Sequence, residues 1–447
     1  MGLADSAQRP SQFGFCAPNA QKPGETYDVA VVGAGLAGMS AAVFAANRGL
    51  RVVQVGNAGA LLFSSGLLDL LGVHPIEEGT AWREPWAGLA ALRRDLPHHP
   101  YAKLAAALLR AAFGELVAAL DEAGLAYTPP GETNHEILTG VGTLKSTYCL
   151  PRSMQPGAEA LGVRAPCLLV DFEGLREYSA KAIAAGAAAR WPGLRTLRLA
   201  FPAPGIAGEV YAAHIAQALE GRAARERLAD LVRPHLGDAR AVGLPAVLGI
   251  MRTAPAVAHL GEALGVPVFE VPTMPTSVPG LRLKNALERA VAARRVDRRV
   301  HGRAVAVEHS GDAFEVSVAA MPAPVTLHAR AMILATGRFM GGGLEASRTR
   351  VREPLLDLHV TQPATRSDWH RVDLLDACGH ALNRAGIEVD NGFRALDARG
   401  VVVHPRLFAV GTILAHHDWA RMKCGAGLAI GTAAAAVARL VKELPGC

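Results

Sequence analysis

The stretch 27–54, YDVAVVGAGLAGMSAAVFAANRGLRVVQ, constrains the fold more than any other, because a glycine-rich loop joins a β-branched run to an Ala-rich segment and a second apolar run. This order predicts strand, loop, helix and strand. Gly33 would let the backbone turn, Gly35 would let it approach a pyrophosphate, and Gly38 would let the helix pack on the strand. Free N–H groups at the positive end of the helix then face the anion. The predicted phosphate-binding residues are Gly33, Gly35, Leu36, Ala37 and Gly38, with a plain tight turn as the alternative.

The acid that usually ends the second strand of such a unit is missing. That acid binds the ribose of an adenosine, and counting along LRVVQVGN puts Gly56 in its place. Either the adenosine is held differently, or the ligand is a mononucleotide such as FMN, which has no adenosine to hold. The loop therefore predicts a bound nucleotide and leaves both kinds open.

Length, composition and charge limit the number of domains and the classes of partner that this chain can have. The 447 residues are enough for two or three packed units, and a chain that is 50% hydrophobic and 19% charged is expected to fold. The 46 basic and 40 acidic residues are spread along the chain apart from 289–303, which argues against a nucleic-acid partner. No apolar stretch of about 18 residues is convincingly uninterrupted, the nearest being 428–440, and the N-terminus lacks a signal pattern. The sequence therefore predicts a cytoplasmic protein.

Cysteine and histidine spacing gives no metal motif. The six cysteines include no CxxC pair, so neither an iron–sulfur cluster nor a zinc site is predicted from this chain alone. The only adjacent histidine pairs, His98–His99 and His416–His417, lack the helical spacing and neighbouring carboxylates of common metal sites. We expect solvated or packing histidines, and if electrons leave this protein a partner must take them.

The pattern along the chain predicts a discontinuous nucleotide-binding domain interrupted by an inserted α/β unit. Residues 1–25 mix Pro, Gly, Ser, Gln and Asn and are predicted to be a flexible tail. The first part of the domain covers 26–164, the inserted unit 165–275, and the second part 276–447. Within the first part, the prolines of 82–99 predict a surface connection. Within the insertion, a strand, a helix and a strand precede two amphipathic helices.

Several later glycines and hydroxyls are candidates for contact with the nucleotide. In flavoproteins that open with such a loop, the segment after the second strand passes the flavin ring, and the last strand of the nucleotide domain closes with ATG. A final strand then precedes a helix whose unpaired N–H groups can approach the flavin pyrimidine. The corresponding candidates are Ser64, Ser65, Gly66, Thr336, Gly337, Gly411, Thr412, Gly425 and Gly427. Thr412 stands where such proteins carry an acid for the ribityl chain, and an ST-turn is the alternative for Ser64 and Ser65.

Four basic residues are candidates for binding an anionic substrate. Lys145 lies among hydroxyls in a glycine-bearing turn, which suits an anion or a hairpin. Arg282 falls in the first turns of a predicted helix, where a cation is unfavourable to the helix dipole, and this favours a binding role. Arg352 and Arg366 belong to the basic stretch 348–366, for which an anion site, a docking surface and a solvated face are the alternatives. No catalytic residue is predicted.

An ordered set of motifs resembles the B subunit family of anaerobic glycerol-3-phosphate dehydrogenase. The motifs are GAGLAG, FSSGLLDLL, GTLKSTY, VPTMPTSVPGLRLKNAL, ATGRFMGGGL with VREPLLDLHV and TQPATR, LFAVGTIL and CGAGLAIG. The resemblance runs from about residue 27 to 440 and includes the missing acids at Gly56 and Thr412. The tail and the loop 415–423, with its histidine pair, depart from it. The resemblance implies an α/β fold: a two-dinucleotide-fold flavoprotein with a Rossmann-like FAD/NAD(P)-binding domain and an inserted α/β unit.

The same resemblance implies a cofactor, partners and a reaction. The B subunit of this family is described as carrying FMN, with FAD as the alternative, and it pairs with an FAD-bearing catalytic A subunit. An iron–sulfur C subunit attaches the pair to the inner face of the cell membrane and passes electrons to quinone. The implied reaction oxidises glycerol 3-phosphate to dihydroxyacetone phosphate. Two alternatives stay open: a non-catalytic flavin relay in that complex, and a self-sufficient fumarate-reductase-type flavoenzyme acting on a hydroxy or dicarboxylic acid.

Overall fold

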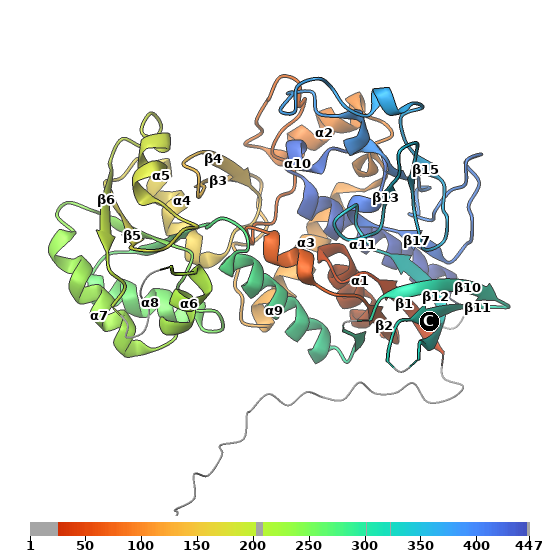
Figure 1. Ribbon diagram of the computed structural model, residues 1–447, viewed down its shortest axis with the longest axis horizontal. Helices are drawn as coiled ribbons and strands as arrows, with labels where there is room; N and C mark the ends of the chain where they lie inside the picture. The colour runs from red at the N-terminus through yellow and green to blue at the C-terminus, as the bar shows by residue number, and fades with distance from the viewer. Residues whose placement is uncertain (1–25, 203–208, 301, 322, 445–447) are drawn as a thin grey trace, which may run out of the picture.

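The computed structural model describes residues 26–202, 209–300, 302–321 and 323–444. The predicted tail 1–25 lies outside the described residues. The described chain forms two bodies that lie side by side in Figure 1, a larger one on the right that includes both ends of the described chain and a smaller one on the left built from the middle of the sequence. This arrangement is an α/β fold with an insertion, as the sequence predicts.

A mixed seven-stranded sheet forms the centre of the larger body. Its strands are β1 (Tyr27–Val32), β2 (Val52–Val55), β9 (Asp297–Arg299), β10 (Ala304–Ser310), β11 (Ala313–Val318), β12 (Val325–Leu334) and β17 (Leu407–Ala409). β1 lies between β2 and β12 and is parallel to both, and β9 and β17 continue the parallel part. β11 and β10 extend the β12 edge in antiparallel order. The carboxyl ends of β1, β2, β12 and β17 therefore meet at one edge, where ligands bind in sheets of this kind.

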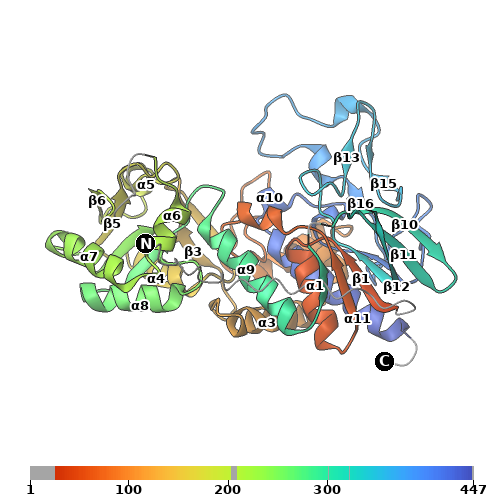
Figure 2. The ribbon, with the colours of Figure 1, turned by 60° about the horizontal axis from the view of Figure 1, so that its bottom comes forward.

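Four long helices pack beside this sheet, as Figure 2 shows. They are α1 (Leu36–Asn47), α3 (Ala106–Glu122), α9 (Val278–Ala293) and α11 (Gly425–Glu443). By length and composition α11 could cross a membrane, but most of it is buried inside the fold, as in the core helix of a globular protein. It packs along α1, whose run Ala37–Ala45 is wholly buried. These two helices hold the nucleotide loop and the C-terminal segment together.

The inserted body has its own four-stranded parallel sheet, in the order β6, β5, β7, β8. Its strands are β5 (Cys167–Phe172), β6 (Leu194–Leu199), β7 (Ala241–Pro245) and β8 (Val268–Val271). Its helices are α4 (Gln155–Gly162), α5 (Ala180–Ala187), α6 (Ala212–Ala218), α7 (Arg222–Val232) and α8 (Thr253–Leu264). The core of this body also takes in Leu138 and Leu161, which precede residue 165. Leu138 ends β3 (His135–Leu138), the hairpin partner of β4 (Leu144–Thr147).

One segment differs from the sequence prediction. The stretch 82–99, expected to be a surface connection broken by prolines, contains the helix α2 (Pro85–Asp95). Pro85 occupies the first turn of α2, where a missing N–H costs no hydrogen bond, so the proline starts the helix instead of breaking it.

The segment between β12 and β17 contains several two-residue strands and forms the upper part of the larger body in Figure 2. They are β13 (Glu345–Ala346), β14 (Val351–Arg352), β15 (Val360–Thr361) and β16 (Gly386–Ile387). The short helix α10 (Trp419–Met422) follows β17 and leads into α11. This upper region contains most of the basic stretch 348–366.

Candidate nucleotide-binding site

The loop between β1 and α1 contains three glycines, and a side chain is disfavoured at each of them for a different reason. Gly33 has a φ of +120°, and a β-carbon there would lie 2.2 Å from the Ala335 carbonyl oxygen at the end of β12. A β-carbon on Gly38 would lie 2.0 Å from the Gly33 carbonyl oxygen. Around Gly35, by contrast, no heavy atom lies within 4 Å of the position a β-carbon would take. Two glycines therefore close the loop onto the fold, and the middle one faces open space.

That open space adjoins the start of α1, where backbone N–H groups lack helical partners. The N-cap, Gly35, has no side chain, and the first turn of α1 contains no acidic residue. Gly33, Gly35 and Leu36 are only half-buried, whereas the run Ala37–Ala45 is buried. A helix N-terminus that has no capping group of its own and opens to solvent fits the pyrophosphate of a dinucleotide.

The ends of β12 and β17 border the same loop. The position of a β-carbon on Gly337 lies 3.7 Å from Thr412 Oγ1, which brings the ATG segment and the final strand together. Gly411 has a φ of +77°, and a β-carbon there would lie 2.6 Å from Ala37 Cβ. Thr336 Oγ1 is buried and has no hydrogen-bond partner among the described residues. The predicted residues of these segments are thus gathered around α1, with a buried hydroxyl whose hydrogen-bonding capacity the protein leaves unused.

The end of β2 confirms that no acid stands in the ribose position. Gly56 has a φ of +136°, and a β-carbon there would lie 3.3 Å from the Ala34 nitrogen, so a side chain would crowd the loop. The nearest carboxylate on the neighbouring strand β9, Asp297, is paired with Arg299 at 2.9 Å and accepts the Tyr27 hydroxyl. Burial is the main cause that raises the pKa of Tyr27 to about 12. An adenosine bound here would need partners other than a carboxylate of β2.

The segment after β2 packs on α9 and presents few free donors. Ser64 Oγ donates to the Leu61 carbonyl at 2.8 Å, and the Ser64 carbonyl accepts from Ser277 Oγ at 2.6 Å. Gly66 has a φ of +74°, and a β-carbon there would lie 2.9 Å from Pro279. Ser65 is half-buried, and its hydroxyl makes no hydrogen bond within the described part of the chain. Of the three candidates, Ser65 alone retains a hydroxyl for a ligand.

The expectation that Gly427 presents an unpaired N–H is wrong. Its N–H donates to the Asp69 carbonyl at 2.8 Å, and a β-carbon on Gly427 would lie 2.1 Å from the Tyr101 hydroxyl. Gly425 similarly faces the ring of Trp419, 3.0 Å from its β-carbon position. The first turn of α11 is capped by a segment more than 300 residues upstream, a contact that local sequence cannot reveal.

The four basic candidates are not brought together. Arg282 is 3% exposed, makes two hydrogen bonds to Glu270 at 2.6 and 2.9 Å, and donates to the Gly249 carbonyl, so it holds β8 to α9 and is closed to a substrate. Arg352 pairs with Glu345 at 2.7 Å on the surface, and Arg366 lies over the ring of Trp369 at 4.2 Å. Lys145 pairs with Asp69 at 2.7 Å.

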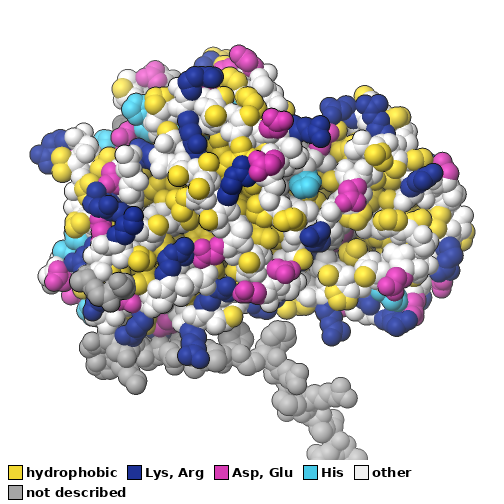
Figure 3. All heavy atoms as spheres, turned by 180° about the vertical axis from the view of Figure 1, so that it is seen from behind, with side chains coloured by type: hydrophobic (Ala, Val, Ile, Leu, Met, Phe, Trp, Pro, Cys, Tyr) yellow, Lys and Arg dark blue, Asp and Glu magenta, His cyan; other side chains and the backbone are white. Residues whose placement is uncertain are grey.

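Acidic and basic side chains are interspersed over the face opposite to that of Figure 1, with apolar side chains between them (Figure 3). No broad basic patch is visible in this view.

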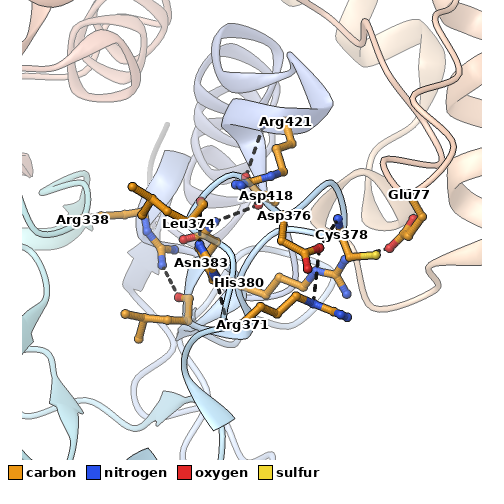
Figure 4. A network of polar contacts seen from close by, with 12 residues as sticks. Glu77, Arg338, Arg371, Leu374, Asp376, Cys378, His380, Asn383, Asp418 and Arg421 are labelled. Atoms are coloured by element: carbon orange, nitrogen blue, oxygen red, sulfur yellow. Dashed lines mark hydrogen bonds and ion pairs between the residues drawn. The ribbon is translucent and has the colours of Figure 1, made fainter. Parts of the chain in front are cut away.

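The half-buried arginine after the ATG segment positions neighbouring loops, a role that the sequence analysis missed. Arg338 donates to the carbonyls of Ala385 at 2.6 Å and Leu382 at 2.9 Å, and burial lowers its pKa to about 10. Nearby, the buried Asp418 accepts from Asn383 at 2.9 Å and from Arg421 at 3.3 Å (Figure 4). These contacts fix the loop before β16 against the entrance to α11. Arginine directly after ATG is the only sequence signal for this role.

The two histidine pairs meet in space. The rings of His98 and His416 lie 5.5 Å apart and those of His99 and His417 lie 6.2 Å apart. His416 pairs with Glu388 at 2.8 Å, whereas both ring nitrogens of the buried His417 lack a hydrogen-bond partner among the described residues. No group of three His, Cys, Asp or Glu side chains in the described ranges is placed to hold a metal ion. The rings of His99 and His417 contact each other in the interior of the fold.

These buried histidines predict a loss of stability in mild acid. Burial lowers the pKa of His417 to about 3 and that of His99 well below its usual value, and neighbouring basic side chains lower both pKa values further. For His417 these neighbours are Arg338 and His416, and for His99 they are His417, His74, His416 and Arg384. Because the unfolded chain binds these protons near pH 6.5 and the folded chain does not, stability is present above about pH 6.5 and falls below it, by up to about 1.4 kcal/mol per pH unit for each histidine.

Urea denaturation between about pH 7.5 and pH 5 measures this slope. His417→Leu should remove roughly one proton from this pH dependence, because the buried imidazole of His417 takes up its proton in the unfolded chain and not in the folded one. The exposed His235, changed to Leu, is the control and should leave the slope unchanged. Equal slopes in wild type and His417→Leu would refute the assignment.

Three comparisons with known proteins show what the chain is similar to. The family model described as FAD binding domain matches residues 28–428 of the chain. The B subunit of anaerobic glycerol-3-phosphate dehydrogenase from Yersinia pseudotuberculosis is 30% identical, and the match covers 94% of this chain and 99% of that protein. The protein of the same name from Vibrio vulnificus is 28% identical, covering 92% of this chain and 96% of that protein. Among solved structures, 3-ketosteroid delta1-dehydrogenase from Sterolibacterium denitrificans matches with a TM-score of 0.43 and 12% identity, covering 94% of this chain and 100% of that one.

Proposed function

The chain belongs to the B subunit family of anaerobic glycerol-3-phosphate dehydrogenase, within the FAD-binding oxidoreductases, and we propose that it is the flavin-carrying B subunit of a glycerol-3-phosphate:quinone oxidoreductase. In this proposal the complex oxidises glycerol 3-phosphate to dihydroxyacetone phosphate and passes the electrons through an iron–sulfur C subunit to quinone. An FAD-bearing A subunit is the second partner. The chain would lie at the inner face of the cell membrane, held there by one of its partners.

The observation that carries the flavin assignment is the open space beside Gly35 at the start of α1. The N–H groups of Leu36 and Ala37 would hold the pyrophosphate there, because helix N-termini attract anions. Thr336, directly after β12, borders the same loop, since its backbone nitrogen lies 3.1 Å from the position of a β-carbon on Gly33. When bound, the flavin supplies a two-electron acceptor for the carbinol of the substrate.

We propose FAD as the bound flavin. The matched family model describes FAD binding and gives no support to FMN, the first expectation from the sequence. Gly56 then requires that the adenosine ribose be held by groups other than an acid of β2. Flavin extracted from the purified chain decides between the two cofactors.

Activity measurements on the assembled complex separate the proposal from its alternatives. We expect the chain to copurify with a second flavoprotein and an iron–sulfur protein, and the assembly, but not the isolated chain, to reduce a quinone analogue with glycerol 3-phosphate. Turnover of malate or succinate by the isolated chain would favour a self-sufficient flavoenzyme. A complex whose B subunit lacks flavin, yet still reduces a soluble dye with glycerol 3-phosphate, would favour the relay.

The basic stretch 348–366 predicts one contact with a partner subunit. Arg348 and Arg350 are exposed, and the same upper region exposes the apolar side chains of Val372, Leu374 and Leu375. Large exposed apolar side chains beside arginines are typical of subunit interfaces. Reversing the charge of Arg348, Arg350 and Arg352 to Glu should weaken assembly by at least about tenfold and leave flavin content unchanged.

The matched control reverses three exposed arginines of the inserted body, Arg222, Arg227 and Arg233. This control should assemble normally in size-exclusion chromatography of the co-expressed complex. Intact assembly and activity in the first triple variant would remove the basic stretch from both docking and anion binding.

A further inference from the structure

Three sequence motifs that lie far apart in the chain meet beside the first turn of α11. Leu68 and Cys149 exchange two backbone hydrogen bonds of 3.0 and 3.1 Å. The N–H groups of Gly72 and Val73 both donate to the Met422 carbonyl, at 3.1 and 3.0 Å. Together with the cap of α11 by Asp69, these bonds fix the segments 68–73, 144–149 and 422–427 to one another. Side chains on these segments therefore have fixed relative positions.

The junction gathers three charged groups. Asp69 Oδ2 accepts from Lys145 Nζ at 2.7 Å, while Asp69 Oδ1 is buried and has no hydrogen-bond partner within the described chain. Lys423 reaches the surface and has no ion-pair partner among the residues described. Burial of its ammonium group lowers the pKa of Lys423, Lys145 lowers it further, and Asp69 and Asp418 raise it. Lys145 is paired with Asp69, and Arg421 is paired with Asp418, so the ammonium group of Lys423 leaves the junction with a net positive charge.

The position of Lys423 is held by an uncommon backbone conformation. Its φ of +52° lies in the left-handed region, which L-residues other than Gly, Asn and Asp enter at a cost of roughly 1 kcal/mol or more. Its Cβ packs against Gly72, where a β-carbon would lie only 2.8 Å away. A glycine at 72 therefore makes room for the lysine. A lysine that served only as a solvated surface charge would not require this fit.

The junction lies close to the nucleotide loop along α11. Gly427 belongs to the junction, since its N–H donates to the Asp69 carbonyl. Five residues further along α11, the Thr432 hydroxyl accepts the Gly411 N–H at 2.8 Å. Gly411 in turn lies beside Ala37 of the nucleotide loop. Five residues of helix span roughly 7.5 Å. A small molecule bound at the junction would thus lie near the site proposed for the flavin.

We propose that Asp69, Lys145 and Lys423 form the subsite for the substrate, a small polyol phosphate monoester. The inference rests on the function proposed above and assigns its substrate to residues. The two ammonium groups attract the phosphate dianion, and the unpartnered oxygen of Asp69 accepts a substrate hydroxyl, which relieves an unsatisfied buried acceptor. Carboxylates are commonly held by the planar fork of arginine, but the arginine closest to the junction in sequence, Arg421, is paired with Asp418. Lysine point charges therefore favour a phosphate over a dicarboxylate.

Binding of sn-glycerol 3-phosphate to the purified full-length chain, measured by isothermal titration calorimetry, tests the subsite. Lys423→Met should weaken binding by at least about tenfold, because it removes the unpaired charge of the junction. Lys423→Arg should restore most of the affinity. Lys181→Met, which removes an exposed lysine of α5, is the matched control and should bind as wild type. Flavin content should be equal in all four proteins.

The outcomes distinguish this inference from the proposed function. Unchanged affinity in Lys423→Met, or no binding by wild type that carries its flavin, would overturn the subsite and leave the flavoprotein assignment standing. Tighter binding of malate than of glycerol 3-phosphate, dependent on Lys423, would overturn the phosphate class. A purified chain that contains no flavin but still binds glycerol 3-phosphate through Lys423 would support the subsite and contradict the flavoprotein assignment. Binding of inorganic phosphate equal to that of glycerol 3-phosphate would contradict a role for Asp69 in holding the hydroxyl.

Discussion

A Gly35→Val variant is expected to fold like wild type and to contain less than about one-tenth of its flavin, because the new side chain fills the space that the pyrophosphate needs. No protein atom lies within 4 Å of the position of the new β-carbon, and the φ of Gly35 is −73°, so the fold itself tolerates the substitution. Replacing glycine at an N-cap costs of the order of 1 kcal/mol at most. Visible absorbance and far-UV circular dichroism of the purified variant measure flavin and folding separately.

Two further glycines serve as controls for this experiment. Gly114, in α3, also faces open space, so Gly114→Val should keep both fold and flavin. Gly38→Val should lose both, because its β-carbon would lie 2.0 Å from the Gly33 carbonyl oxygen. If Gly35→Val retained full flavin occupancy, the loop would not be the cofactor site.

The largest effect on stability is expected at the buried pair of Arg282 and Glu270. Arg282→Met leaves the Glu270 carboxylate 0% exposed and without its counter-charge, which typically costs about 3–5 kcal/mol. Glu270 also accepts the Leu248 N–H at 2.7 Å. A displacement of the unpaired Glu270 carboxylate would therefore loosen the inserted sheet as well as the contact with α9. Urea denaturation of the variant measures the loss.

The exposed pair of Arg352 and Glu345 provides the matched control. Arg352→Met should cost less than about 1 kcal/mol, since both side chains are largely solvated. The double variant Arg282→Met with Glu270→Met should recover part of the stability, because no isolated charge is then buried. A variant Arg282→Met that is as stable as wild type but binds no substrate would restore the anion-binding role that the sequence predicts for this arginine.

The nucleotide loop can be predicted from the sequence because its determinants are local. Gly33, Gly35 and Gly38 act within one turn between a strand and a helix, and the structure gives each a distinct steric reason. The strand that closes with ATG is predictable on similar grounds, as a buried run followed by a glycine, and it pairs with β1 as such strands do.

The errors have a common physical origin in contacts between distant segments. Gly427 is a glycine because of Tyr101, and Arg282 faces Glu270 instead of a ligand. The second of these has a sequence signal, since a single acid within the buried run VFEV requires a partner inside the protein. Asp69 is likewise a single acid within an apolar run, LLDLL, and therefore also requires a polar partner. The sequence around Lys423 contains no signal that it lies near Asp69.

The flavin released from the purified full-length chain tests the central claim most directly. Acid denaturation followed by chromatography against FAD and FMN standards should yield about one FAD per chain, with a yellow native protein whose absorbance disappears on loss of the cofactor. Recovery of FMN would contradict the choice of FAD and confirm a flavoprotein. A folded chain that is colourless as purified and takes up neither FAD nor FMN on reconstitution would contradict the account as a whole.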